Sequence, residues 1–177
     1  MTKKYKNIVA ALFSALMVIC AWITVPTVVP FTMQTLAVFL TAQLLTLRYS
    51  LLSMGIYVGL GVAGLPVFSG FQGGIGTLLG PTGGYITGFV IIILTTAIAM
   101  KILGDGQFVR IISMTAGLVL CYVLGTAWFM IITKTNLISA LIICVLPYII
   151  FDIAKMFFAC LLYKKLKKLI KEKPHFF

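Results

Sequence analysis

The sequence has 177 residues, of which 62% are hydrophobic and only 10% are charged. Soluble domains contain about 45–50% apolar and about 25% charged residues, so this composition excludes an ordinary water-soluble domain. The net charge of +11 would suit nucleic acid, but the basic residues flank apolar segments instead of forming one basic face with stacking groups, which argues against nucleic-acid binding.

Six apolar segments follow one another along the chain. A helix needs about 20 apolar residues to cross a hydrocarbon layer about 30 Å thick. We predict transmembrane helices at residues 7–25, 32–47, 50–65, 85–103, 110–132 and 137–163, and then a basic tail at 164–177. The predicted fold is an all-α integral membrane protein in which residues 1–177 form a single domain.

The first two segments differ in polarity. The first follows three lysines, as a signal peptide would, but its length and its lack of a small-residue cleavage site favour a retained helix that ends at Pro26. Residues 26–30 then form a loop. The second segment is polar for a lipid-facing helix, because it contains Gln34, Thr35, Thr41 and Gln43.

The third segment is short and glycine-rich, which permits close contact with a neighbouring helix. Residues 66–84 come next, with glycine and proline too dense for any helix. Long loops in compact domains are commonly lids or binding loops. The apolar Phe68, Phe71, Ile75, Leu78 and Leu79 indicate that this loop packs back onto the bundle.

The distribution of lysine and arginine predicts the orientation. Cytoplasmic loops carry an excess of these residues. With the N-terminus inside, twelve of the fourteen lie on the inner side, Lys134 lies outside, and Lys155 lies within the last span. Both termini are therefore predicted to be cytoplasmic, and the 66–84 loop is predicted to face outwards.

Asp152 and Lys155 lie three residues apart in the last helix and share one face. A charged side chain near the membrane centre costs about 2.5–3.5 kcal/mol on insertion scales, so such residues are usually functional. The pair could bind a solute that has both hydrogen-bond donors and an anionic group. Alternatively, it is a structural ion pair that locks the bundle.

Several other functions lack the residues they need. The four cysteines show no CxxC spacing, and His175 is the only histidine, which disfavours metal ligation and histidine-based triads. The GxGxxG spacing from Gly59 to Gly64 lies in a membrane helix, not in a βαβ unit, and no P-loop motif occurs. We predict no enzyme activity and no cofactor, so any ATP hydrolysis would need a partner.

Four segments of the sequence resemble BioY proteins, the biotin-binding S components of energy-coupling factor (ECF) importers. They occur in the order and spacing of that family: PFTMQT from Pro30, GLPVF from Gly64, GPTGGY from Gly80, and FDIAK from Phe151. The resemblance covers nearly the whole chain. It departs at Leu47-Arg48-Tyr49-Ser50, where the family often has glycine and proline.

The resemblance implies a multi-pass plasma-membrane subunit, bacterial or archaeal, that binds biotin from outside under an outer loop. It implies partners as well: a transmembrane coupling subunit and two ATPases, besides membrane lipid. The family's binding aspartate and lysine match Asp152 and Lys155, and its docking pattern on the first helix matches Ala11 and Ala15.

Biotin offers ureido N–H donors, a ureido carbonyl, a carboxylate and an apolar chain. Asp152 could accept the ureido N–H groups, while Lys155 could pair with the carboxylate or donate to the ureido carbonyl. The further predicted contacts are Gln34, Phe68, Gln72, Gly83, Gly84 and Tyr85. Two alternatives stay open: another small vitamin as the ligand, or a structural membrane protein whose pair binds nothing.

Overall fold

The computed structural model describes the backbone of residues 3–172 and the side chains as far as Lys167. Residues 173–177, the end of the predicted basic tail, lie outside the described residues. The elements, in chain order, are α1 (Lys3–Trp22), β1 (Thr24–Val25), β2 (Phe31–Thr32), α2 (Gln34–Leu44), α3 (Leu47–Val62), the 3-10 turn η1 (Ser69–Phe71), α4 (Ile75–Leu79), α5 (Gly83–Leu103), α6 (Gln107–Thr133), α7 (Leu137–Cys144) and α8 (Leu146–Glu172).

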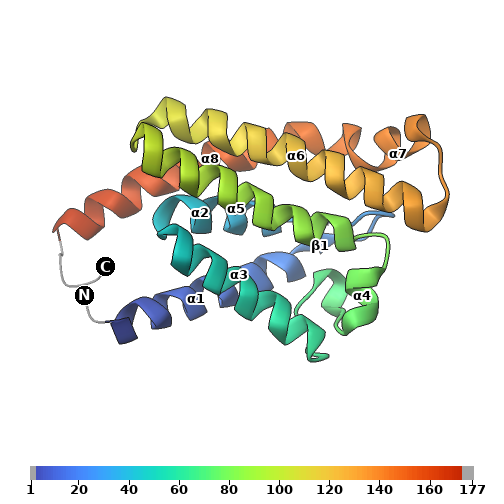
Figure 1. Cartoon of the computed structure of the whole chain (residues 1–177), viewed down its shortest axis with the longest axis horizontal. Coiled ribbons are helices and arrows are strands. Elements are labelled where there is room, and N and C mark those ends of the chain that lie inside the picture. The colour runs from blue at the N-terminus through green and yellow to red at the C-terminus, as the bar shows by residue number, and fades with distance from the viewer. Residues whose placement is uncertain (1–2, 173–177) are drawn as a thin grey trace.

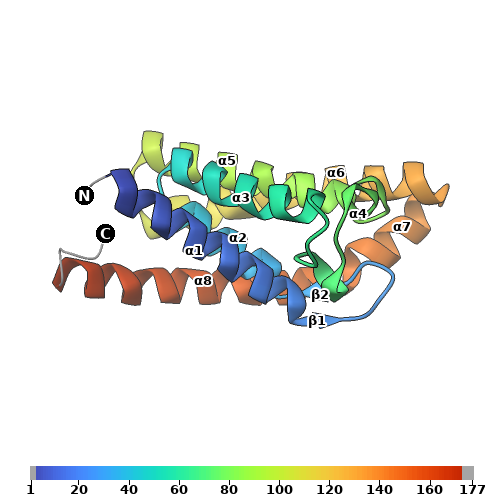
Figure 2. The ribbon, with the colours of Figure 1, turned by 90° about the horizontal axis from the view of Figure 1, so that it is seen from below.

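The long helices lie side by side in one elongated bundle (Figure 1). The start of α1 and the end of α8 lie at one end of it, together with the α5–α6 turn, whereas the β1–β2 hairpin, α4 and α7 lie at the opposite end (Figure 2). The bundle therefore has a terminal end and a loop end, and we use these names below.

Four stretches are long and apolar enough to cross a membrane: Lys3–Trp22, Gly83–Leu103, Gln107–Thr133 and Leu137–Lys167, which combines α7 and α8. The two remaining apolar helices, α2 and α3, have 11 and 16 residues. At about 1.5 Å per residue they are about 16 and 24 Å long, less than the hydrocarbon thickness. The chain is thus a largely helical membrane protein in which four stretches are long and apolar enough to span the membrane and two apolar helices are shorter.

The short helix α2 lies at the centre of the bundle. It contacts α1, α3, α5 and α8, and its side chains are buried on every face. This position explains three of the four polar residues of the second apolar segment, because Thr35, Thr41 and Gln43 each find a partner inside the protein. The buried amide nitrogen of Gln34 has no partner among the described residues. Thr41 donates to the Ala37 carbonyl at 2.7 Å, and the Gln43 amide donates to the Phe39 carbonyl at 3.2 Å.

The structure corrects several predicted boundaries. The first helix ends at Trp22 and not at residue 25, because Thr24 and Val25 pair antiparallel with Thr32 and Phe31. The 66–84 segment is not free of helix, since it contains η1 and α4 and since α5 already begins at Gly83. The third helix begins at Leu47, before the predicted residue 50.

The last predicted helix, residues 137–163, is broken into α7 and α8. Val145 separates them with φ −124° and ψ −57°. Pro147 has no N–H to donate to the Ile143 carbonyl, and its ring clashes with that carbonyl in a continuous helix. The break tilts α7 away from the α8 axis (Figure 2).

The 66–84 loop is attached to the bundle by its own apolar residues and by two tryptophans. The Trp22 indole donates to the Pro66 carbonyl at 2.8 Å, and the Trp128 indole donates to the Gly80 carbonyl at 2.9 Å. Phe68 is fully buried and meets the Tyr57 ring edge to face at 5.5 Å. The prediction of a loop that packs onto the bundle is confirmed for Phe68 and Leu78, whereas Phe71, Ile75 and Leu79 are exposed.

A polar cluster joins the α5–α6 turn to α8 at the terminal end. The Asp105 carboxylate accepts from Arg110 at 2.5 Å and from the Tyr163 hydroxyl at 2.6 Å, and it also pairs with Lys167. The Arg110 guanidinium is buried and lies 4.2 Å from the centre of the Tyr163 ring. The Asp105 carboxylate therefore connects the α5–α6 turn with both α6 and α8.

Glycine lets α5 and α6 approach closely. A Cβ on Gly117 would lie 2.8 Å from Ile92 Cα and 2.4 Å from Thr95 Oγ1, and backbone cannot yield as a flexible side chain can. We expect Gly117→Ala to lower the free energy of unfolding by about 1–3 kcal/mol through overpacking, measured by thermal unfolding in detergent. The control is Gly55→Ala, whose Cβ would meet nothing within 4 Å. Equal melting temperatures for the two variants would contradict this.

The Asp105 cluster makes stability depend on pH. Burial alone would raise the pKa of Asp105, but hydrogen bonds from Lys167, Tyr163 and Arg110 outweigh it and lower the pKa below its usual value of 3.8. A carboxylate with a lowered pKa stabilises the fold above its unfolded pKa, and this stabilisation is lost as the pH falls through the folded pKa. We expect the melting temperature to fall in acid below about pH 4.

The matched variant is Asp105→Asn, which keeps the size and removes the charge. We expect it to lower the melting temperature at neutral pH by about 2–4 °C, equivalent to about 1 kcal/mol for a chain of this length. The drop between pH 5 and pH 3 should be smaller in this variant than in the unsubstituted chain. An identical acid profile in both proteins would remove Asp105 as the cause.

Candidate functional site

Asp152 and Lys155 lie in α8, and both side chains point into the bundle. Their relative exposures are only 5% and 7%, and Lys155 Nζ lies 2.8 Å from Asp152 Oδ1. A buried ion pair offsets the loss of hydration only when further hydrogen bonds satisfy the remaining donors and acceptors. The surroundings of the pair therefore decide whether it is stable.

All three protons of the Lys155 ammonium have acceptors. Nζ donates to the Thr32 carbonyl at 2.6 Å, to Thr35 Oγ1 at 3.0 Å, and to the aspartate at 2.8 Å. An ammonium has three donors, so it is saturated. Nζ also lies 4.2 Å from the centre of the Phe31 ring, which gives a cation–π contact.

The Asp152 carboxylate accepts from three groups. Oδ1 accepts from Thr35 Oγ1 at 2.8 Å as well as from Lys155, and Oδ2 accepts from the Tyr122 hydroxyl at 2.6 Å. Thr35 thus donates to the acid and accepts from the base. The pair, Thr35 and Tyr122 form one connected network.

Chain segments far apart in sequence supply this network. The hairpin β1–β2 turns the chain so that the Thr32 carbonyl and the Phe31 ring face α8. Thr35 lies in the first turn of α2, directly after the hairpin, and Tyr122 comes from the middle of α6. The site therefore depends on the packing of α2, α6 and α8.

A small cavity lies beside the pair, with a volume of about 60 Å³. We call it the polar cavity. Its lining comes from the hairpin, α2, α5, α6, α7 and α8: Val29, Pro30, Thr32, Thr35, Tyr85, Phe89, Leu118, Cys121, Tyr122, Cys144, Tyr148, Asp152 and Lys155. Aromatic and aliphatic walls around one acid and one base suit a small organic ligand that is both apolar and polar.

The hairpin covers the polar cavity at the loop end. Val29 is buried, and its carbonyl accepts a hydrogen bond from the Tyr148 hydroxyl. The same hydroxyl lies 3.0 Å from Thr27 Oγ1. No residue of the 66–84 loop lines this cavity, so residues 29–32 form its cover in this structure.

Of the predicted further contacts, the structure brings Tyr85 to the cavity. Its ring lines the wall from α5, and its hydroxyl lies 3.1 Å from Thr126 Oγ1. The others do not line the cavity. Gln34 is buried at the start of α2, Gln72 is exposed in the loop, and Phe68 packs on Tyr57.

Gly83 and Gly84 are also outside the lining and have packing roles. A Cβ on Gly83 would lie 1.7 Å from the Leu78 carbonyl oxygen, and a Cβ on Gly84 would lie 2.4 Å from Trp128 Cβ. Both positions therefore require glycine for close approach at the start of α5. Ala11 and Ala15 lie on α1 and are exposed, so that face of α1 is free for contact.

Sequence reasoning did not single out Thr35, Tyr122, Phe31 or Tyr148 as site residues. Thr35 had a signal, because it is one of four polar residues in an otherwise apolar segment. Tyr122 had no such signal, because a tyrosine in an apolar helix is usually interpreted as part of the hydrophobic core. Among the side chains that the structure describes, no group of three His, Cys, Asp or Glu could hold a metal ion.

Comparison with known proteins places this arrangement in context. The BioY family profile matches residues 2–172. The biotin transporter BioY of Thermotoga maritima is 38% identical over 168 residues, which cover 93% of this chain and 96% of that protein. The probable biotin transporter BioY of Pyrococcus horikoshii is 41% identical over 158 residues, covering 89% and 93%.

A solved structure agrees with the fold. The crystal structure of the S-component for biotin from an ECF-type ABC transporter superposes with a TM-score of 0.87, at 26% identity and with 95% of each chain covered. The similarity therefore extends over nearly the whole of both chains.

The buried network predicts an asymmetry between single and double substitutions. Lys155→Met leaves the Asp152 carboxylate buried without its cation, which we expect to lower the free energy of unfolding by about 3–5 kcal/mol. Asp152→Leu combined with Lys155→Met removes both charges. We expect this double variant to be at least as stable as the unsubstituted chain, measured by thermal unfolding in detergent. A double variant less stable than the unsubstituted chain would contradict this.

Proposed function

This chain belongs to the BioY family, and from that premise we propose that it binds biotin for import as the S component of an ECF-type transporter. The observation that carries the proposal is the buried Asp152/Lys155 pair, which lies beside a cavity with aromatic walls. An acceptor, a cation and an apolar surface match the ureido group, the carboxylate and the chain of biotin.

We assign the ligand's polar contacts to the groups that already form the network. Asp152 accepts a ureido N–H in place of the Tyr122 or Thr35 hydroxyl, and Lys155 pairs with the carboxylate or donates to the ureido carbonyl. Tyr85 contributes wall area. Gln34, Gln72, Phe68, Gly83 and Gly84 stay predicted contacts. All of these except Gln34, which lies in α2, require the 66–84 segment to move towards the cavity.

Binding requires the polar cavity to expand. Its volume of about 60 Å³ is well below the roughly 300–1,000 Å³ of sites for small organic ligands. The hairpin is the part proposed to move, because it has only two residue pairs. Its bonds to α8, from the Tyr148 hydroxyl to the Val29 carbonyl and from Lys155 to the Thr32 carbonyl, must break for it to do so. In the proposed mechanism this cover lifts, biotin replaces the internal hydrogen bonds, and the cover closes again.

We propose six crossings with both termini in the cytoplasm. The terminal end carries Lys3, Lys4, Lys6, Arg48, Lys101 and Arg110, whereas Lys134 lies at the loop end. This asymmetry follows the positive-inside rule. The short helix α2 then crosses at the centre of the bundle, α3 crosses with one face buried and the other exposed, and the polar cavity lies towards the outside.

The proposed partners follow from the energy requirement. The chain contains no P-loop motif, so uptake driven by ATP needs ATPases and a membrane subunit that couples them to this chain. The exposed Ala11 and Ala15 are spaced for close helix packing, and we propose that they contact the coupling subunit.

One observation favours the structural alternative. Because every donor of Lys155 has an acceptor inside the protein, the pair is stable without a ligand. The biotin-binding hypothesis and the structural hypothesis predict different effects of vitamins on the melting temperature. A pair that only locks the bundle gives no change in melting temperature with biotin, with riboflavin or with thiamine.

We expect biotin to bind the detergent-purified chain and to raise its melting temperature. Equilibrium titration with labelled biotin measures the affinity, and riboflavin and thiamine serve as ligands of other specificity. Saturable binding of another vitamin but not of biotin would show that the proposed ligand is wrong and would identify that vitamin as the ligand. Binding of none of the three would support the structural alternative.

We expect Lys155→Ala to weaken biotin binding by about 2–3 kcal/mol, or roughly 30- to 150-fold, because a charge-assisted contact in a buried site is lost. Lys101→Ala, an exposed lysine at the terminal end, is the control and should bind as the unsubstituted chain does. Undiminished binding by Lys155→Ala would remove this residue from the site.

A further inference from the structure

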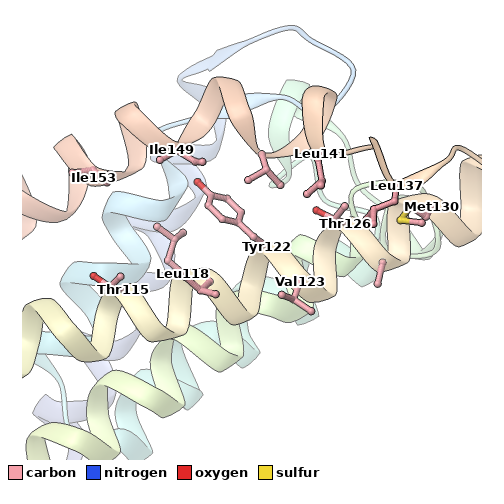
Figure 3. A pocket seen from close by; sticks show the side chains of 13 residues that line it. Thr115, Leu118, Tyr122, Val123, Thr126, Met130, Leu137, Leu141, Ile149 and Ile153 are labelled. Carbon is pink, nitrogen blue, oxygen red and sulfur yellow. The ribbon is translucent and has the colours of Figure 1, made fainter. Parts of the chain in front are cut away.

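A second and much larger cavity lies on the other side of Tyr122. It runs between α6 on one side and α7 and α8 on the other, and its volume is about 540 Å³ (Figure 3). We call it the lateral groove. Leu118 and Tyr122 line both the lateral groove and the polar cavity, so these two side chains form the wall between them.

The lateral groove offers no polar group to a ligand. Its three hydroxyls already have partners. Thr115 donates to the Ile111 carbonyl at 2.8 Å, Thr126 lies 3.1 Å from the Tyr85 hydroxyl, and Tyr122 donates to Asp152. The rest of the lining is hydrocarbon, apart from the Met130 thioether. A polar solute such as biotin would lose its hydration here without compensation.

The lateral groove opens sideways, towards the membrane. Val123 on α6 and Leu137 on α7 line it and are 61% and 55% exposed. Both belong to stretches apolar and long enough to span a membrane. The groove extends along α6 from Thr115 to Met130, about 22 Å at 1.5 Å per residue, which exceeds half of a hydrocarbon layer about 30 Å thick.

A cation lies at the loop end of the lateral groove. Lys134 follows Met130 by one helical turn, is exposed, and caps α6 with a left-handed backbone. It forms no ion pair with any residue whose side chain the structure describes. A lysine one helical turn beyond the last α6 residue that lines the lateral groove complements the phosphate of a lipid whose acyl chain fills the groove.

We propose that the lateral groove is a binding site for one phospholipid, with an acyl chain between α6 and α8 and the phosphate at Lys134. The acyl chain of the lipid packs against Leu118 and the Tyr122 ring. It thereby keeps the Tyr122 hydroxyl hydrogen-bonded to Asp152. A bound lipid is then part of the wall of the polar cavity. This inference does not depend on the identity of the transported solute.

The test is a lipid titration of the delipidated chain in detergent, followed by native mass spectrometry. With dioleoyl phosphatidylglycerol we expect one saturable adduct per chain. Val123→Trp fills the groove and should weaken this adduct at least tenfold. Leu141→Trp, from the opposite wall, should do the same, and Lys134→Gln should weaken it about threefold.

The matched control is Leu124→Trp, which adds the same ring to an exposed α6 residue outside the lateral groove. It should retain the lipid. Dihexanoyl phosphatidylglycerol has the same headgroup with short chains and should not compete. No adduct on the unsubstituted chain, equal retention by both groove variants and the control, or full competition by the short-chain lipid would each overturn the proposal. Circular dichroism checks that all the variants are folded.

Discussion

A lysine and an aspartate buried within a membrane bundle must satisfy every donor and acceptor inside the protein. Lys155 does this with three acceptors, and two of these come from residues 32 and 35, more than a hundred positions earlier in the chain. The hairpin, the start of α2 and the inward face of α8 are therefore held together by one network. Tyr122 adds α6 to it through the second oxygen of Asp152. These four elements have little freedom to move independently while the pair is buried.

The same constraint accounts for the short central helix. The chain must turn into a hairpin for the Thr32 carbonyl to reach Lys155, and only then can α2 begin, so α2 has 11 residues instead of the 20 that a full span needs. A helix surrounded by protein need not match the bilayer, because its polar ends meet other helices and not lipid. This also permits Thr41 and Gln43, which would be costly on a lipid-facing surface.

Hydropathy and charge predicted much of this fold from the sequence, since the position of each apolar segment is a local property. The insertion cost of Asp152 and Lys155 likewise identified the pair without a structure. Tyr122 and the Thr32 carbonyl were missed because their roles exist only after α6, α8 and the hairpin have packed. Pro147 was a local signal for the break between α7 and α8. The prediction nevertheless gave one continuous helix, because the apolar pattern on both sides of Pro147 is uninterrupted. The 66–84 loop was correctly predicted to pack onto the bundle, but its partners Trp22 and Trp128 are long-range contacts.

Because the buried pair already has all its hydrogen-bond partners within the protein, a ligand of the proposed site must exchange with them. Any solute that enters displaces hydroxyls from Asp152 or acceptors from Lys155, and a buried charged group left unpaired costs several kcal/mol. An apolar solute cannot replace the hydrogen bonds of Asp152 and Lys155. A solute with only donors can replace those of Asp152, and a solute with only an anionic group can replace those of Lys155. A molecule that carries N–H donors, a carbonyl and a carboxylate can restore all of them, while its chain covers the aromatic wall. The internal network thus stabilises the buried pair and sets the standard that a ligand of the proposed site must meet.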